Sequence, residues 1–253
     1  MAIDAHTHIH ELGLNEVKKV LENREVLPVL TGHSPESNER AVEYGKLLNI
    51  PFVIGIAPQA AQQMSFKAIQ NIVNNMEYLI TTSKPNAIGE IGLDYHWAKR
   101  DIEKQRQIYV FKKMIGIAKE HRLPIVIHSR KSIDHALSII NELKFDEYIM
   151  LHFFSEIPNN KELLDSPNII ISIPTLHSKS RKKAIESTPI EQLVVETDSP
   201  YVAKTPEDVK KSIEYISSIK QIKPKEVEIK TSKNAAKIFN INVERIRMFN
   251  IKW

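Results

Sequence analysis

The sequence predicts an α/β protein, a single-domain (β/α)8 TIM barrel, and two observations support that prediction. Eight short runs rich in apolar and β-branched residues recur along the chain, and segments with helical periodicity separate several of them. Near-continuous apolar strands that alternate with helices indicate a parallel sheet covered on both faces. The length of 253 residues also suits a barrel built from eight such units.

An open doubly wound sheet is the competing architecture. Such a sheet more often carries a glycine-rich phosphate-binding turn after its first strand. This chain has only seven glycines and no such turn, so the closed barrel is favoured. Because no linker or shift in composition divides the chain, we expect residues 1–253 to form one domain.

The predicted strands are short apolar runs, most of which end next to polar residues. They cover residues 2–6, 25–32, 52–58, 86–95, 124–129, 148–154, 168–174 and 193–200. In a parallel barrel the carboxyl ends of all eight strands meet at one face, which is where barrel enzymes keep their active sites.

The predicted helices between the strands carry recognisable start signals. Ser34 before Pro35 is typical of an N-cap followed by a proline in the first turn, and Thr205 before Pro206 repeats the pattern. Residues 101–122 have the periodicity of one amphipathic helix. Its predicted apolar face consists of Ile108, Phe111, Ile115 and Ala118.

Composition narrows the function classes. The chain has no cysteine, which excludes disulfides, zinc–thiolate sites and a thiol nucleophile. A formal net charge of +4 permits a polyanionic partner without requiring one. No apolar run is long enough to span a bilayer and no secretory signal opens the chain, so we expect a cytoplasmic protein without a membrane partner. A monomer is compatible with the sequence.

Six residues of metal-ligand type fall at or near the carboxyl ends of five predicted strands. His6 and His8 close the first strand, and residues two apart in a strand point the same way. The other four are Glu90, His128, His152 and Asp198. A single histidine at a strand end is usually structural, but six such residues at one face predict a site for Zn²⁺ or Mn²⁺. His10 lies past the strand, and we expect it to cap the chain or face solvent.

Five short motifs give the chain a resemblance to a known family. They are "DAHTHIH", "GEIGLDYHW", "PIVIHSR", "LHFFSE" and "ETDSPYV", in order between residues 4 and 202, and "KNAAKIF" at 233–239 resembles a C-terminal helix of the same family. With these motifs the sequence resembles the TatD family of metal-dependent deoxyribonucleases, within the amidohydrolase-like barrels.

The resemblance implies a site for two divalent ions, Zn²⁺, Mn²⁺ or Mg²⁺. His6, His8 and Asp198 would hold one ion, His128 and His152 the other, and Glu90 would bridge them. The implied reaction is hydrolysis of phosphodiester bonds in DNA by a water that the two ions activate. Asp198, Glu196 and Glu90 are the candidate catalytic residues. Glu196 points the same way as Asp198 and either orients a ligand or accepts a proton, although it can equally be a buried, satisfied carboxylate.

Two other functions fit the same residues. The ligand set serves hydrolysis of an ester or amide, such as an aminoacyl linkage, as well as it serves phosphodiester hydrolysis. A third interpretation is that the protein is a metal-dependent nucleic-acid-binding module with little catalytic activity. Turnover of DNA, RNA and ester substrates separates the three.

Basic and aromatic residues near the mouth are candidates for substrate binding. Arg130 follows His128 and either holds a phosphate or is a surface charge. A basic run follows the seventh strand, where a short helix is expected around 178–187, and it either binds phosphates or is a solvated helix face. The run contains Lys179, Arg181, Lys182 and Lys183. The aromatic residues near the mouth that can stack on bases are Tyr95, Trp97, Phe153 and Phe154. Phe153 can equally belong to the core.

One departure from the family pattern follows the third strand. The family usually carries a histidine-proline-histidine stretch there, whereas this chain has Ala57, Pro58 and Gln59. The two histidines are not among the main implied ligands, so we expect metal binding to survive their loss, and we expect weak deoxyribonuclease activity. His33, after the neighbouring second strand, is either a replacement for one imidazole or an ordinary loop histidine before the Ser34 cap.

Overall fold

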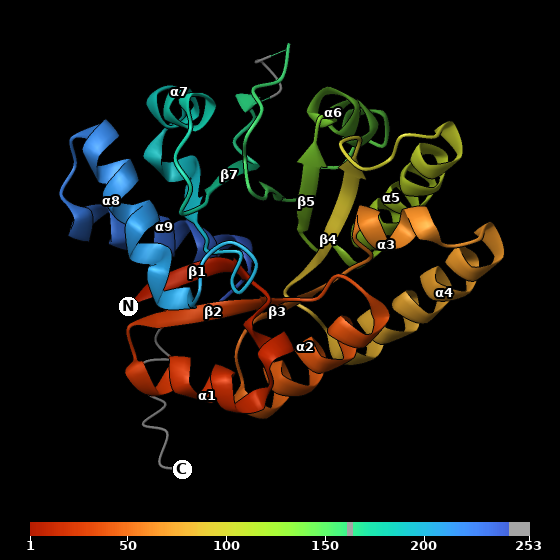
Figure 1. The fold of residues 1–253 in the computed structure, drawn as a ribbon, viewed down its shortest axis with the longest axis horizontal. Coiled ribbons are helices and arrows are strands. Elements are labelled where there is room, and N and C mark those ends of the chain that lie inside the picture. Colours follow the sequence, from red (N-terminus) through yellow and green to blue (C-terminus); the bar gives the residue numbers. More distant parts are fainter. Residues whose placement is uncertain (161–163, 243–253) are drawn as a thin grey trace.

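The computed structural model describes residues 1–160 and 164–242, and it confirms the predicted (β/α)8 TIM barrel. One sheet of eight parallel strands runs in the order of the sequence and curls into a nearly closed barrel (Figure 1). The strands are β1 (Ala2–Thr7), β2 (Val26–Thr31), β3 (Phe52–Ile54), β4 (Ala87–Asp94), β5 (Ile125–Arg130), β6 (Ile149–Leu151), β7 (Ile169–Ile173) and β8 (Leu193–Val195). The expectation that residues 1–253 form one domain extends beyond the described part and stays a prediction.

The barrel closes where the chain after β8 returns to β1. The backbone N–H of Asp198 donates to the carbonyl of His6 at 3.0 Å, and the N–H of His8 donates to the carbonyl of Ser199 at 2.7 Å. Almost every strand residue is buried on both faces, which is why the strands read as continuous apolar runs rather than as alternating ones.

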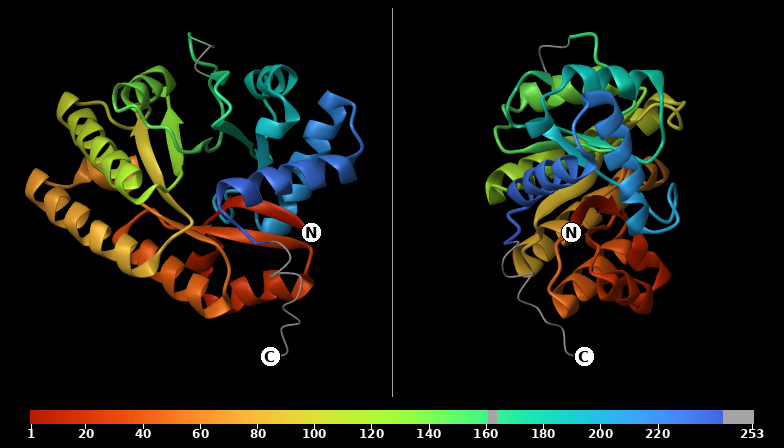
Figure 2. Two further views of the ribbon diagram at one scale, coloured as in Figure 1. Left: turned by 180° about the vertical axis from the view of Figure 1, so that it is seen from behind. Right: turned by 90° about the vertical axis from the view of Figure 1, so that its left-hand side faces the viewer.

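The helices lie outside the strands, and Figure 2 shows α4 and α5 side by side on the outer side of β4. They are α1 (Leu14–Asn23), α2 (Pro35–Leu48), α3 (Pro58–Gln63), α4 (Phe66–Ser83), α5 (Asp101–His121), α6 (Ile133–Glu142), α7 (Lys179–Ser187), α8 (Val209–Lys220) and α9 (Pro224–Ile238). Across residues 1–160 and 164–242, none of the helices has the combined length and apolar character needed to cross a bilayer.

The structure confirms the predicted N-cap at Ser34 but not the one at Thr205. Ser34 caps α2, since its side chain accepts a hydrogen bond from the N–H of Ser37. Ser178 caps α7 in the same way, through the N–H of Arg181 at 3.2 Å. The expectation for Thr205 is wrong in detail: a 3-10 turn over Pro206–Asp208 precedes α8, and the Thr205 side chain makes no cap hydrogen bond.

Three strands are shorter than predicted at the end that faces the site. The sequence suggests strands to residues 58, 154 and 200, whereas β3, β6 and β8 end at Ile54, Leu151 and Val195. Beyond these points the chain leaves the strand ladder and turns over the mouth of the barrel. Phe153 and Asp198 have left-handed backbone conformations, with φ of 49° and 53°, that no strand allows.

Candidate metal centre

The six predicted ligand residues converge at the carboxyl end of the barrel. His6, Glu90 and His128 lie within β1, β4 and β5, whereas His8, His152 and Asp198 lie just beyond the ends of β1, β6 and β8. Five of them, all except the fully buried His6, line a cavity of about 270 Å³. The other residues that line it are His33, Ala57, Gln59 and Tyr201. The site is built by loops and strand ends rather than by strands alone.

The Glu90 carboxylate stands between two pairs of imidazoles. Its Oε2 lies 3.8 Å from Nε2 of His6 and 3.8 Å from Nε2 of His8. Its Oε1 lies 2.6 Å from Nδ1 of His128 and 4.0 Å from Nε2 of His152. One carboxylate therefore presents a different oxygen to each pair.

Asp198 completes the side of the centre that contains His6 and His8. Its Oδ1 lies 3.3 Å from Nε2 of His8 and 3.7 Å from Nε2 of His6, and the two Nε2 atoms are 3.1 Å apart. The ring of His6 also stacks on that of His152 with centroids 3.6 Å apart, which brings the two halves of the centre together. The ligand atoms of His6, His8 and Glu90, and those of Glu90, His128 and His152, form groups that can each hold a metal ion.

Hydrogen bonds on the far side of the ring orient the imidazoles of His8 and His152. Nδ1 of His8 donates to the carbonyl of Thr31 at 2.6 Å, and Nδ1 of His152 donates to Oε2 of Glu196 at 3.0 Å. Both rings therefore point Nε2 into the centre, which is the usual arrangement of a metal-binding histidine. Glu196 is fully buried and also accepts a hydrogen bond from the N–H of Phe153, so it contacts a candidate ligand rather than the cavity.

Neighbouring charged groups shift the pKa values of the carboxylate and the imidazoles in the centre, against the effect of burial. Burial raises the pKa of the Glu90 carboxyl, but the hydrogen bond to His128 and the surrounding imidazoles outweigh burial and hold that pKa well below its usual range. Burial lowers the pKa of the His128 imidazole, yet Asp94 and Glu90 raise it to about 10. Glu196 similarly raises the pKa of His152 to about 9 against the effect of burial. Metal ions that bind these imidazoles would displace protons from them.

The residues present fit divalent metal ions. Four imidazoles and two carboxylates are the ligands that Zn²⁺ and Mn²⁺ prefer in proteins when no thiolate is present. Within the described part of the chain, Nδ1 of His6 is buried and has no hydrogen-bond partner, although its Nε2 faces the other ligands. Since Nε2 is the nitrogen of His6 that faces His8, Glu90 and Asp198, it is the atom of this ring that is available to a cation.

Asp94 belongs to this centre and was missed in the sequence. Its Oδ2 lies 3.0 Å from Nε2 of His128, so it holds the ring whose Nδ1 faces Glu90. Asp94 follows Glu90 by four residues on β4, and the period of two in a strand was the signal that could have found it. Position 92, midway between Glu90 and Asp94, requires glycine because a Cβ there would lie 2.0 Å from the carbonyl oxygen of His128.

A second network lies next to His8. Glu11 accepts hydrogen bonds from His33 at 2.6 Å and from Ser37 at 2.9 Å, and Tyr201 donates to its other oxygen.

The prediction that His10 faces solvent is wrong: its side chain is fully buried, and its Nε2 lies 3.0 Å from Oγ of Ser37. His10 leaves the surface because a 3-10 turn over Ile9–Leu12 carries the chain inward beneath α2.

The positions of the missing family histidines face the same cavity. Ala57 is buried and lines it, and the N–H of Ala57 donates to the carbonyl of His33 at 3.0 Å. Gln59 donates to Oδ2 of Asp94 at 3.0 Å, and its amide nitrogen lies 3.4 Å from Nε2 of His128. Gln59 therefore takes part in orienting His128, whereas Ala57 leaves open space beside His33.

The predicted substrate residues do not all reach the mouth. Arg130 is exposed, with its guanidinium 6.0 Å from the ring of Trp97, which is itself 56% exposed. Lys179, Lys182 and Lys183 are exposed along α7. Arg181 differs, because its side chain is buried and donates to the carbonyls of Phe154 and Leu176. It fixes the loop after β7 and has little surface left for a phosphate.

The aromatic residues also divide between the mouth and the core. Phe154 is 3% exposed and packs in the core, so the expectation that it stacks on bases is wrong. Phe153 is half-buried beside His152. The hydroxyl of Tyr95 bonds to Nδ1 of His135 at 2.6 Å, at the edge of the mouth.

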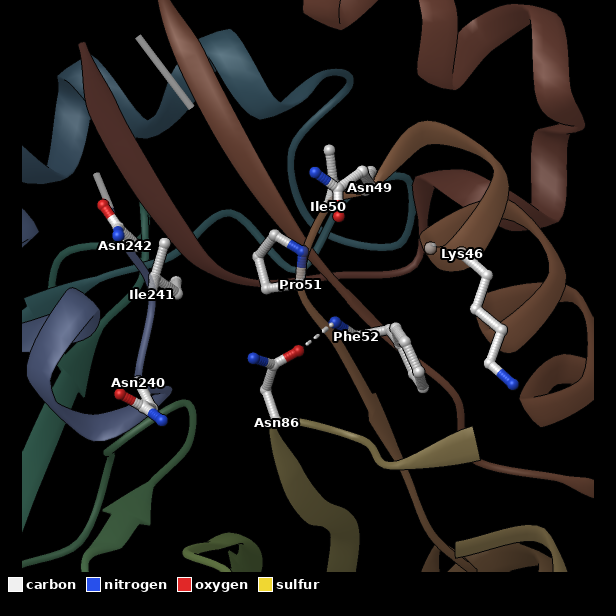
Figure 3. Close-up of a pocket in the computed structure, with 10 residues that line it drawn as sticks. Lys46, Asn49, Ile50, Pro51, Phe52, Asn86, Asn240, Ile241 and Asn242 are labelled. Carbon is white, nitrogen blue, oxygen red and sulfur yellow. Dashed lines mark hydrogen bonds between the residues drawn. The ribbon is translucent and has the colours of Figure 1, made fainter. Parts of the chain in front are cut away.

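Another cavity, of about 380 Å³, lies at the opposite end of the barrel, where β3 and β4 begin (Figure 3). Its lining residues include no carboxylate and no imidazole. The Asn86 side chain in it accepts from the N–H of Phe52 at 3.0 Å and donates to the carbonyl of Phe239 at 2.8 Å, so its polar atoms serve the fold. This cavity offers no comparable chemistry.

Comparisons with known proteins identify relatives across nearly the whole chain. A family model described as TatD related DNase matches residues 3–240. An uncharacterized metal-dependent hydrolase of Methanocaldococcus jannaschii is 34% identical over 251 residues, which cover 94% of this chain and 96% of that protein. The human protein named deoxyribonuclease TATDN3 is 29% identical over 206 residues, which cover 76% of this chain and 73% of the human one.

Solved structures share the fold. A TatD family hydrolase from Entamoeba histolytica superposes with a TM-score of 0.81 at 19% identity, covering 95% of this chain and 98% of the other. The TatD homologue YJJV from Escherichia coli gives a TM-score of 0.78 at 19% identity, with 94% and 98% covered. At this level of identity the likeness concerns the architecture alone.

Proposed function

The chain belongs to the TatD family of metal-dependent hydrolases, and we propose that it hydrolyses phosphodiester bonds in DNA with two divalent ions held by the six converging side chains. The observation that carries the proposal is the position of Glu90, which presents one oxygen to His6 and His8 and the other to His128 and His152. A carboxylate that faces two sets of ligands is suited to bridge two ions. The name of the human relative supports DNA as the substrate.

The proposed ligand sets follow the geometry of the centre. His6, His8 and Asp198 would hold one ion, His128 and His152 the other, and Glu90 both. When bound, two ions of this kind supply an acidified water and neutralise the charge that develops on a phosphate.

The remaining residues have positioning roles in this proposal. Glu196 keeps the proton of His152 on Nδ1, and Asp94 holds the far nitrogen of His128. Because Glu196 is fully buried behind His152, it acts through that ring and not on the substrate.

Asp198 is the partly exposed carboxylate of the centre, and we assign it the additional task of accepting the proton of the attacking water.

Turnover with a panel of substrates tests the proposal. Purified protein is stripped with a chelator, reloaded with Mn²⁺, Mg²⁺ or Zn²⁺, and incubated with end-labelled DNA, end-labelled RNA and an aminoacyl ester. We expect metal-dependent DNA cleavage that the chelated protein does not show. Turnover of the ester without DNA cleavage would assign the site to ester hydrolysis, and DNA binding without any turnover would leave a binding module.

A further inference from the structure

A shallow cavity on the rim of the barrel contains a stacked pair of aromatic rings. It lies between the loop after β7 and α8, has a volume of about 400 Å³, and is lined by Thr175, Leu176, His177, Lys211, Glu214, Tyr215 and Ser218. The imidazole of His177 lies parallel to the ring of Tyr215, with centroids 3.7 Å apart and an angle of 11°. We propose that this pair is a stacking subsite for an unpaired nucleobase of the strand that is cut at the metal centre.

The pair is held in place before any ligand arrives. The hydroxyl of Tyr215 donates to the carbonyl of Ser178 at 3.1 Å, and Ser178 in turn caps α7 through the N–H of Arg181. Tyr215 packs against the core with part of its ring, whereas His177 is exposed. The anchored Tyr215 ring therefore supports one face of the imidazole, and the other face of the exposed imidazole is available to a ligand.

A continuous series of contacts connects the pair to the centre. The ring of His152 lies 5.8 Å from that of Phe153, and the guanidinium of Arg181 lies 4.7 Å from the Phe153 ring. Arg181 then donates to the carbonyl of Leu176 at 3.2 Å, which is the residue before His177. The loop that carries His177 therefore lies at the same end of the barrel as the metal centre, and in this proposal a strand with a phosphate at the metals extends toward the pair.

The chemistry of the cavity suits a base better than a phosphate. Leu176 is 49% exposed at its edge, and stacked rings beside an exposed leucine present apolar surface. Glu214 would repel a phosphate but can accept a hydrogen bond from the amino group of adenine, cytosine or guanine. Lys211 already pairs with Asp208 at 2.6 Å. The volume also lies within the range of about 300–1,000 Å³ that is typical of small-ligand sites.

Only an unpaired base can use this surface. In a duplex both faces of each base are covered by its neighbours, whereas a base in a single strand can stack on a protein ring whatever its identity. The exposed Lys179 and Lys183 on the first turns of α7 would then face the phosphates of the same strand. This inference rests on the proposed action on DNA.

Binding of single strands to ring variants tests the subsite. Fluorescence anisotropy is measured with a labelled single-stranded phosphorothioate DNA in the presence of Mg²⁺. We expect His177→Ala to weaken binding about tenfold, since stacking on an aromatic side chain contributes substantially for each base. His177→Phe, which keeps a flat ring, should restore binding, and binding of duplex DNA should be equal for all variants. Tyr78→Ala is the matched control, because it removes an aromatic ring that is 72% exposed on α4.

A scan with abasic nucleotides identifies the bound base. One abasic position in the strand should weaken binding to the parent protein and leave the His177→Ala variant with no further loss. If His177→Ala binds like Tyr78→Ala, or if His177→Phe fails to restore binding, the subsite is refuted while the proposed nuclease activity can still stand. If the parent protein neither binds nor cuts DNA, both the subsite and the proposed function are refuted.

Discussion

Nδ1 of His128 lies 2.6 Å from Oε1 of Glu90, while the other oxygen of the same carboxylate faces His6 and His8. The contact joins β5 to β4, and through Glu90 it joins both strands to β1. A substitution of Glu90 should therefore affect both the half of the centre that contains His6 and His8 and the half that contains His128. No other carboxylate in the described part of the centre contacts both the His6–His8 pair and His128.

Glu90→Gln should reduce metal binding at both proposed sites together. The amide keeps the shape of the side chain but replaces one acceptor oxygen with a donor group, so each site loses charge and one loses its ligand. Elemental analysis after loading and gel filtration should give close to two ions per chain for the parent and clearly fewer than one for the variant. Glu77→Gln, an exposed position on α4, is the control. Full occupancy of both sites in Glu90→Gln would refute the bridging role.

Asp198→Asn should abolish most turnover while the barrel stays folded. The side chain lies beyond the end of β8 and contacts His6 and His8, not the apolar core. Since the loss of an outer-shell partner alone costs 10–100-fold, we expect a loss of at least about 100-fold in kcat/KM on DNA. The melting temperature and far-UV circular dichroism should match the parent. Parent-like activity would remove Asp198 from the catalytic set.

The exposed lysines of α7 should contribute to DNA binding through charge. Replacing Lys179, Lys182 and Lys183 with glutamine should weaken binding and lower the slope of log Kd against log salt by roughly 2, if all three face phosphates. Arg181 is left in place, because its buried side chain holds the loop after β7. Lys18, Lys19 and Arg24 on or next to α1 offer a matched triple substitution elsewhere on the surface. An unchanged salt slope would make the α7 lysines an ordinary solvated face.

Ala57→His should raise DNase activity with little change in metal content. Ala57 lines the cavity without being a ligand, and a missing hydrogen-bond donor to a developing anion costs on the order of 10²–10³ in rate. His33 lines the same cavity and is the candidate replacement, so His33→Ala should lower activity in the parent and do so less in Ala57→His. Steady-state rates of the four proteins in this double-mutant cycle measure the coupling. Additive effects would exclude compensation by His33, and no gain from Ala57→His would point to a substrate other than DNA.

Acid should destabilise the protein partly through His10. Burial lowers the pKa of His10 from 6.5 to about 3, so the unfolded chain takes up a proton at this residue well before the folded chain does. Stability from this source is complete above about pH 6.5 and is lost as the pH falls toward 3, at about 1.4 kcal/mol per pH unit once uptake is full. Urea unfolding in EDTA between pH 7 and pH 5 should therefore show a steeper loss for the parent than for His10→Gln. Equal slopes would mean that His10 does not stay neutral in the folded state.

Much of the barrel could be predicted from the sequence because the patterns that predict its strands and helices are local. Apolar runs of strand length, helical periodicity over Asp101–His121 and the Ser34–Pro35 start each involve neighbours in sequence. The convergence of His6, Glu90, His128 and Asp198 also followed from the sequence, since residues at the carboxyl ends of parallel strands share one face. Their roles as ligands stay predictions, because the geometry is compatible with them but does not test them.

Only the tertiary structure decided which polar side chains face the cavity and which are used inside the protein. The contact of Asp94 with His128 depends on the register between β4 and β5. The burial of Arg181 and His10 and the stacking of His177 on Tyr215 depend on the path of loops. No local pattern encodes such a path, because a loop is fixed by packing and hydrogen bonds to distant elements rather than by periodicity. The sequence alone therefore determined the barrel and the face that carries its polar residues, while the folded chain decided the arrangement of groups around that face.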